Sequence, residues 1–235
     1  MTQAADMDYL IDDLKRGFLR MADNQRWYEQ EWLGVPIWQL PDDLVRLQAV
    51  VSAVQPKWIV ETGTKFGGSA IFFASILECL GSEGGGVVTV DIEGYPLADE
   101  VFASHRLGRW IKGRIVGDAK ADAVVAEIRA KLAHDPGPTL VFLDDWHDAE
   151  HVYAEMERYA PLVTPGSYLI VADTAFEDLA GTPIVAPSPK YPDAAKSNPR
   201  VAVRRFLAER NDFTQEARFA KTGISNFPDG FLRRR

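Results

Sequence analysis

Five acidic residues recur along the chain, each directly after a short apolar run. Successive members are 26 to 30 residues apart, which is about the length of one strand and one helix. Because the carboxyl ends of parallel strands lie at one edge of a sheet, side chains that follow them converge on one crevice. The spacing therefore predicts a ligand site lined by the carboxylates of Glu61, Asp91, Asp118, Asp144 and Asp173.

A glycine-rich turn, ETGTKFGGS, follows the first of these apolar runs at residues 61–69. A turn of this kind lets the backbone approach a ligand beside a helix N-terminus, and a purely structural role is the alternative. The glycine spacing matches neither the dinucleotide pattern GxGxxG nor the P-loop pattern GxxxxGK[ST]. The residues predicted to contact a cofactor here are Glu61, Gly63, Thr64, Gly67, Gly68 and Ser69.

Two of the other acids suit the two parts of a nucleoside. Asp91 follows VVTV, at a position from which a carboxylate accepts hydrogen bonds from ribose hydroxyls, and Asp118 lies where an adenine ring would bind. A crevice for ribose and adenine without a pyrophosphate favours S-adenosylmethionine as the cofactor. Asp144 is predicted to lie beside the same cofactor.

The densest polar cluster is LDDWHDAEH at residues 143–151. Mg²⁺ prefers carboxylate oxygens, and Asp144 with Asp173 on a neighbouring strand could supply two of them. His147 is the candidate general base, because the ordinary pKa of histidine lies near neutrality.

Three other interpretations of this cluster stay open. Asp145 or Asp148 caps a helix that starts near His147. His147 and His151 are four residues apart on one helical face, a spacing seen in zinc sites, although no HExxH pattern accompanies them. Either histidine is an ordinary surface or core residue, which we favour for His151.

The elements that must position these residues alternate between strands and helices. The strands are predicted at 58–60, 87–90, 114–116, 140–143 and 168–171, and the helices between them at 69–80, 97–107, 119–132 and 148–159. Continuous apolar strands that alternate with helices indicate a parallel sheet covered on both faces. Further along, we expect a proline-rich loop at 176–198, a helix at 200–210 and a closing hairpin of strands 213–219 and 230–234. The predicted fold class is α/β, Rossmann-like, with a mostly parallel seven-stranded sheet, a C-terminal antiparallel hairpin and N-terminal helices.

The first 55 residues are predicted to form a helical and aromatic segment ahead of a catalytic domain at 56–235. Apolar spacing predicts an amphipathic helix at 4–24, and a second helix at 42–54 opens after Pro41. Residues 27–40 between them hold three of the six tryptophans and are too irregular for a strand. A lid over the ligand, a contact in a homo-oligomer and a packed flap are the alternatives for this stretch.

Composition limits the classes of partner that the protein binds and the cellular compartment in which we expect it. A formal net charge of -8 disfavours nucleic acid, which needs clustered Lys and Arg. The chain begins without a signal-peptide pattern and has no apolar run of about 20 residues, so we expect no membrane contact. The single cysteine, Cys79, is predicted to be buried in a helix, so we expect a reducing, cytoplasmic location.

Six segments from about Lys57 to the C-terminus carry a family resemblance: VETGTKFGGSA, VVTVDIE, IVGDA, VFLDDWHDAEHV, PLVTPGSYLIVADT and GFLRRR. They resemble the metal-dependent methyltransferase family that includes the cephalosporin hydroxylase/methyltransferase proteins of cephamycin biosynthesis, and more distantly macrolide-sugar O-methyltransferases. The resemblance implies a class I methyltransferase core, S-adenosylmethionine over the glycine turn and Mg²⁺ held by Asp144 and Asp173. His147 matches a histidine proposed as the base in the sugar enzymes.

One position departs from the family pattern. The family commonly has Glu-Asp after the fifth strand, whereas this chain has Ala172-Asp173, which leaves one carboxylate fewer. Asp145, a substrate oxygen or a water molecule could fill that place at the metal. The resemblance implies Mg²⁺-assisted methylation of a hydroxyl on a small-molecule acceptor, a natural product or a sugar. The rivals are a metal-independent methyltransferase and a noncatalytic partner that binds S-adenosylmethionine.

Overall fold

The computed structural model describes residues 13, 16, 17, 26–219 and 224–235. The amphipathic helix predicted at 4–24 lies almost wholly outside these residues. Two strands of two residues each, β1 (Glu31–Trp32) and β2 (Val35–Pro36), form a small hairpin after the 3₁₀ turn η1 (Arg26–Glu29). The prediction that 27–40 holds no strand is therefore wrong. Leu33 and Gly34 both have positive φ, which is the backbone that a tight hairpin turn requires.

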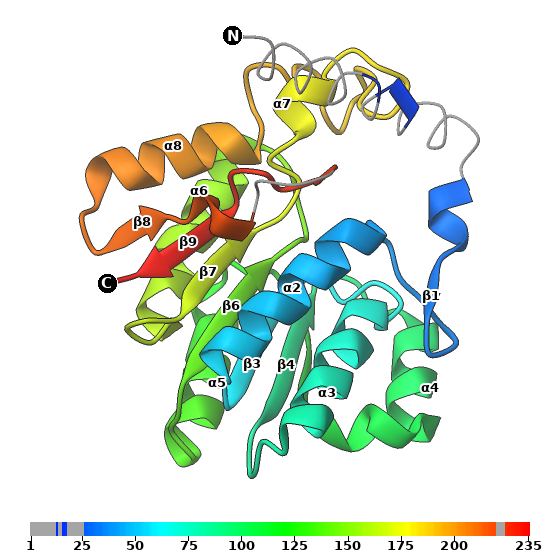
Figure 1. Ribbon diagram of the computed structural model, residues 1–235, viewed down its shortest axis with the longest axis vertical. Helices are drawn as coiled ribbons and strands as arrows, with labels where there is room; N and C mark the ends of the chain where they lie inside the picture. The colour runs from blue at the N-terminus through cyan, green and yellow to red at the C-terminus, as the bar shows by residue number, and fades with distance from the viewer. Residues whose placement is uncertain (1–12, 14–15, 18–25, 220–223) are drawn as a thin grey trace, which may run out of the picture.

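A seven-stranded sheet forms the centre of the molecule (Figure 1), in the order β5-β4-β3-β6-β7-β9-β8. Its parallel strands are β3 (Trp58–Thr62), β4 (Gly86–Asp91), β5 (Ile111–Val116), β6 (Thr139–Leu143) and β7 (Tyr168–Val171). The strands β8 (Phe213–Gln215) and β9 (Phe231–Arg234) add to the β7 edge as an antiparallel pair. These strands confirm the predicted fold class.

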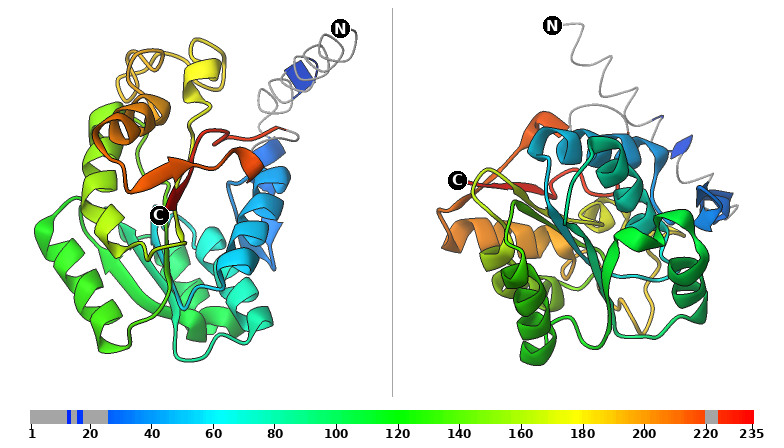
Figure 2. Two further views of the ribbon diagram at one scale, coloured as in Figure 1. Left: turned by 60° about the vertical axis from the view of Figure 1, so that its left-hand side comes forward. Right: turned by 90° about the horizontal axis from the view of Figure 1, so that it is seen from below.

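Helices cover both faces of this sheet (Figure 2). On one face, α2 (Pro41–Val54) and α3 (Gly68–Leu80) pack on side chains such as Ile59 and Phe142. On the other face, α5 (Asp122–His134), α6 (Ala149–Tyr159) and α8 (Pro199–Glu209) pack on side chains such as Val60 and Val141. Neighbouring residues of one strand point to opposite faces, so both faces of the central strands are apolar.

The remaining elements are short. α4 (Pro96–Ser104) is followed by η2 (Arg106–Trp110), because the extended backbone of His105 divides the helix predicted at 97–107. The loop predicted at 176–198 begins with a single helical turn, α7 (Phe176–Leu179). η3 (Ala160–Leu162) follows α6, and η4 (Ala217–Phe219) replaces the end of the strand predicted at 213–219.

Cys79 is exposed, so its predicted burial is wrong. The buried positions at the end of α3 are Phe73, Ile76 and Leu77, which leaves Cys79 on the solvent side of the helix. One of the observations behind the expected cytoplasmic location is thereby removed. No helix in the described part of the chain is long and apolar enough to cross a bilayer.

The N-terminal segment shares its core with the sheet. Val35, Ile37 and Leu47 belong to the same buried cluster as Ile59 and Phe142. The boundary at 55/56 stays a prediction.

A buried polar network around Asp43 ties α2 to the segment before β9. The Asp43 carboxylate is 3.0 Å from Arg46 Nη1 and accepts hydrogen bonds from Ser225 Oγ and the Asn226 backbone N–H at 2.6 and 2.7 Å. Arg46 also donates to the Ile224 carbonyl at 2.8 Å. Two segments that are about 180 residues apart in sequence are thus joined by a polar network whose charged members, Asp43 and Arg46, are buried.

We expect Asp43→Ala to lower the free energy of unfolding by about 3 to 5 kcal/mol, because Arg46 would remain buried without its counter-charge. Urea unfolding followed by circular dichroism measures this loss. The exposed neighbour Asp42 gives the matched control, since Asp42→Ala should change stability by less than about 0.5 kcal/mol. Equal stability of the two variants would show that the network does not hold the two segments together.

Candidate active site

A cavity of about 690 Å³ opens at the carboxyl ends of the parallel strands. Its volume lies in the usual range for small-molecule sites. The strand β3 pairs with β4 on one side and β6 on the other, so the chain reverses its direction of strand addition here, which is where α/β sheets bind ligands. Residues from the segments 28–39 and 176–191 complete the wall.

The cavity brings together most of the predicted cofactor residues. Those that line it are Gly63, Thr64, Gly68, Ser69, Asp91, Asp118 and Asp144, whereas Glu61 and Gly67 do not. Asp173 lines it too, so four of the five acids that follow strands converge as predicted. The fifth acid, Glu61, lies behind the wall.

Glu61 is fully buried beneath the glycine turn. Its Oε2 accepts a hydrogen bond from Thr89 Oγ1 at 2.7 Å, and that hydroxyl also lies 2.7 Å from the hydroxyl of Thr64 in the cavity wall. Burial raises the pKa of Glu61 to about 7, against hydrogen bonds from Ser69 and Thr89 that lower it. Glu61 therefore supports the turn from below.

The three glycines of the turn make room for protein neighbours. A Cβ at Gly63 would lie 2.1 Å from the Asp144 carbonyl oxygen, and one at Gly68 would lie 2.1 Å from the Pro36 carbonyl oxygen. A Cβ at Gly67 would lie 2.7 Å from the Phe102 ring. Gly63 and Gly67 also have φ of 89° and 87°, which favours glycine. The structural explanation of these glycines therefore holds, and close approach of a ligand is not needed to explain them.

The Asp91 carboxylate is held in place by two backbone N–H groups. Its Oδ2 accepts from the Lys65 backbone N–H at 2.9 Å and its Oδ1 from the Glu93 backbone N–H at 3.0 Å. Each oxygen keeps a second lone pair, so two neighbouring hydroxyls can donate to a carboxylate that is already fixed. Asp118 is fixed in a similar way by the Lys120 N–H at 2.9 Å. These carboxylate acceptors and the cavity volume fit the nucleoside part of S-adenosylmethionine.

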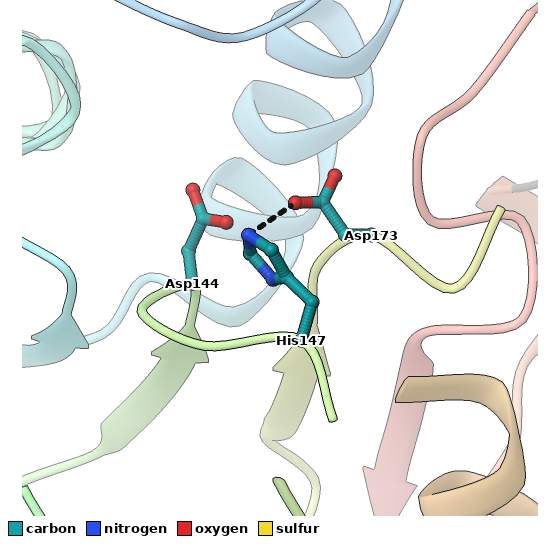
Figure 3. A group of neighbouring side chains, drawn as sticks. All are labelled: Asp144, His147 and Asp173. Carbon is teal, nitrogen blue, oxygen red and sulfur yellow. Dashed lines mark ion pairs between the residues drawn. The ribbon is translucent and has the colours of Figure 1, made fainter. Parts of the chain in front are cut away.

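Asp144, His147 and Asp173 form a compact group in which one atom from each lies within 4.8 Å of the others (Figure 3). Asp144 directly follows β6, and Asp173 follows β7 with a left-handed φ of 55°. Such a backbone is costly for a residue with a side chain and is typical of functional sites. His147 Nε2 lies 3.1 Å from Asp173 Oδ2.

His147 precedes α6, which begins at Ala149. Asp148 is the N-cap and accepts the His151 backbone N–H at 3.1 Å, which confirms one of the alternatives for the polar cluster. His147 and His151 therefore do not share a helical face, and the interpretation as a zinc spacing is wrong.

The electrostatics of this group favour a bound cation. Withdrawal from water, followed by the nearby charges of Asp173, Glu61 and Asp145, raises the pKa of Asp144 well above its usual range. Burial also raises the pKa of Asp173, against the opposing effects of His147 and Lys190. Burial lowers the pKa of His147, so its imidazole is neutral near pH 7. Two crowded carboxylates on rigid elements fit Mg²⁺, whose charge would offset their repulsion.

Asp145 belongs to a second group of possible metal ligands, together with His151 and Glu155. Its carboxylate lies 3.2 Å from His151 Nε2, which in turn lies 3.6 Å from the buried Glu155. Asp145 also lines the cavity, so its part in holding the metal, for which a substrate oxygen and a water molecule are the alternatives, stays a prediction. His151 braces the loop that carries Asp144 and His147 against α6.

Residues that sequence analysis missed complete the site. Gln39 Nε2 donates to Asp144 Oδ2 at 2.6 Å, and only 4% of Gln39 is exposed. Two groups of rings also line the cavity, one with Tyr28, Trp38, Phe66 and Tyr95, the other with Trp146, Phe176 and Tyr191. The density of aromatic residues at 27–40 was visible in the sequence, but nothing marked Gln39 among them.

A family model described as "Rhamnosyl O-methyltransferase/CmcI" matches residues 24–235. The chain belongs to this family. It is therefore an S-adenosylmethionine-dependent methyltransferase, which confirms the resemblance inferred from its sequence segments.

Curated relatives in the family are rhamnosyl O-methyltransferases of mycobacteria. The protein from Mycobacterium tuberculosis is 31% identical over 212 residues, which cover 89% of this chain and 80% of the relative. The protein from Mycobacterium leprae is 29% identical over 210 residues, which cover 89% and 85%.

Solved structures share the fold. A CmcI structure in its Mg–SAM form has a TM-score of 0.60 and 18% identity, and the match covers 88% of this chain and 77% of CmcI. The O-methyltransferase TomG from Streptomyces achromogenes, in complex with SAM, has a TM-score of 0.53 and 23% identity, with 82% and 78% covered.

We expect Glu61→Gln to reduce the loss of stability as pH rises from about 5 to 8. The pKa of Glu61 is raised from 4.5 to about 7 in the folded protein, so the folded state holds this proton more tightly than the unfolded state. The stability that the protonated Glu61 contributes is fully present below pH 4.5 and is lost as the pH rises through 7. Thermal unfolding without cofactor gives the slope of the unfolding temperature against pH. Glu100→Gln, at an exposed residue, is the control. Parallel slopes for wild type and Glu61→Gln would contradict a raised pKa of Glu61 in the folded protein.

Proposed function

We propose that this methyltransferase transfers the methyl group of S-adenosylmethionine to a hydroxyl oxygen of a sugar or another small natural product, with the help of Mg²⁺. The observation that carries the proposal is the convergence of Asp144, His147 and Asp173 on the cavity that holds the glycine turn and Asp91. The relatives named rhamnosyl O-methyltransferases support a sugar hydroxyl as the acceptor.

The residues of the cavity divide between cofactor and acceptor. Bound S-adenosylmethionine supplies an electrophilic methyl group on its sulfonium. Asp91 would bind the ribose hydroxyls, and Asp118 would lie beside the adenine. Thr64 in the turn after β3 and Ser69 in the first turn of α3 would face the methionine part of the cofactor. The aromatic residues around His147 then remain for the acceptor.

Asp144 and Asp173 would hold the metal at the acceptor end. Bound Mg²⁺ supplies positive charge that makes a nearby hydroxyl more acidic. The two carboxylates come from the ends of adjacent strands, so their separation is fixed by the sheet.

His147 would accept the proton of the acceptor hydroxyl. Its imidazole is neutral near pH 7, and its ring packs against Phe176 and Tyr191 at centroid distances of 4.7 and 5.6 Å. Because Nε2 faces the Asp173 carboxylate at 3.1 Å, we assign the proton to Nε2 and the basic lone pair to Nδ1. The main contribution of the protein is to align the acceptor oxygen with the methyl group while this proton leaves.

We expect His147→Ala to lower kcat by about 10²- to 10⁴-fold while the Kd for S-adenosylmethionine stays within about twofold. Transfer of labelled methyl groups to a panel of sugar and phenolic acceptors gives kcat, and calorimetry gives Kd. The exposed His134→Ala is the control. An equal loss of turnover and cofactor affinity would contradict a role as base.

Metal removal tests the other half of the proposal. Exhaustive chelation should abolish methyl transfer, and added Mg²⁺ should restore it in the wild type but not in Asp144→Asn. Activity that survives chelation would favour the rival function, a metal-independent methyltransferase. The metal-independent alternative rests on the observation that Ala172 has no side-chain oxygen to offer a metal.

A further inference from the structure

Gln39 lies beside Asp144, at a metal centre that has one carboxylate fewer than the family pattern. Its amide nitrogen lies 2.6 Å from Asp144 Oδ2, and both residues line the cavity. Ala172, the residue before Asp173, offers no oxygen from its side chain, and the Asp145 carboxylate lies in a separate group with His151 and Glu155. The side-chain amide that contacts Asp144 comes from the N-terminal segment.

The backbone on both sides of Gln39 is fixed. The Ile37 N–H donates to the Gln30 carbonyl at 2.9 Å, and Leu40, only 2% exposed, is the N-cap residue of α2. Gln39 itself is 4% exposed. Its amide is thus held against Asp144 by a hairpin on one side and a helix on the other, as a preorganised ligand must be.

We propose that Gln39 is the third protein ligand of the cation held by Asp144 and Asp173, a proposal that rests on the metal-assisted function above. A side-chain amide carries a donor and an acceptor at nearly equivalent positions. In the structure its N–H₂ donates to the Asp144 carboxylate. When a cation binds that carboxylate, rotation of the amide by half a turn presents Oε1, and carbonyl oxygens suit Mg²⁺ and Mn²⁺.

The amide also sets the charge of the centre. Two carboxylates balance a divalent cation, whereas a third would leave a net negative charge and bind the cation more tightly. Affinity at oxygen-ligand sites follows the number of charged ligands. A neutral third ligand therefore predicts moderate metal affinity, which an acid at position 39 would increase.

The test uses Mn²⁺ as the probe and the full chain loaded with S-adenosylhomocysteine. Calorimetry and electron paramagnetic resonance give the Mn²⁺ Kd without any turnover. We expect Gln39→Leu to raise that Kd at least about tenfold and Gln39→Glu to lower it about tenfold. Gln48→Leu, at an exposed glutamine of α2, should leave it unchanged. The proposal is overturned if Gln39→Leu binds Mn²⁺ like the wild type, or if Gln39→Glu weakens binding as Gln39→Leu does.

Asp144→Asn separates failure of this inference from failure of the proposed function. If Asp144→Asn abolishes Mn²⁺ binding while Gln39→Leu does not affect it, only the role of Gln39 is wrong. If Mn²⁺ binding is unaffected by Asp144→Asn, the metal does not bind at this centre and both proposals fall. Circular dichroism and the affinity for S-adenosylhomocysteine verify that each variant is folded. If Gln39→Leu does not fold, the Mn²⁺ Kd of Gln39→Glu, which keeps the shape of the side chain, tests the role of Gln39.

Discussion

The site depends on the repulsion between carboxylates that the sheet forces together. Asp144 directly follows β6 and Asp173 follows β7, and the pairing of these two parallel strands brings the two residues to the same edge of the sheet. Burial raises the pKa of both side chains, and the charge of Asp173 adds to this effect at Asp144. A cation is the simplest partner that resolves this conflict, and the proposed metal site follows from it.

The surrounding structure keeps the two carboxylates in place. The Asp145 carboxylate, held by His151 and Glu155, fixes the loop after β6, and Gln39 reaches Asp144 from the N-terminal segment. Gly63 lets the turn after β3 contact the Asp144 backbone closely. The large apolar clusters on both faces of the sheet stabilise the strands, so the strain at Asp173 can be tolerated.

The sequence predicted the sheet and the convergence of four acids because both depend on local patterns. Apolar runs of strand length alternate with helical spacing, and residues that follow parallel strands share an edge. The burial of Glu61 could not be predicted, since the last residues of a strand face either the ligand or the core, and the sequence does not show which. Cys79 was misplaced for a related reason, because a mostly apolar helix leaves its solvent side ambiguous.

Contacts between distant segments were beyond the reach of sequence patterns. Gln39 lies 105 residues from Asp144, and only the folding of the hairpin onto the cavity brings them together. The beginning of α6 at Ala149 depended on whether Asp145 or Asp148 became the cap, and both are good capping residues. Tertiary contacts of Asp145 with His151 and Glu155 leave Asp148 as the cap.

A crystal structure with S-adenosylhomocysteine and Mn²⁺, recorded at a wavelength where manganese scatters anomalously, tests the central claim most directly. We expect an anomalous peak between the carboxylates of Asp144 and Asp173, with the ribose hydroxyls of the nucleoside on Asp91 in the same cavity. A nucleoside bound elsewhere, or no manganese between these two carboxylates, would contradict a single site for cofactor and metal.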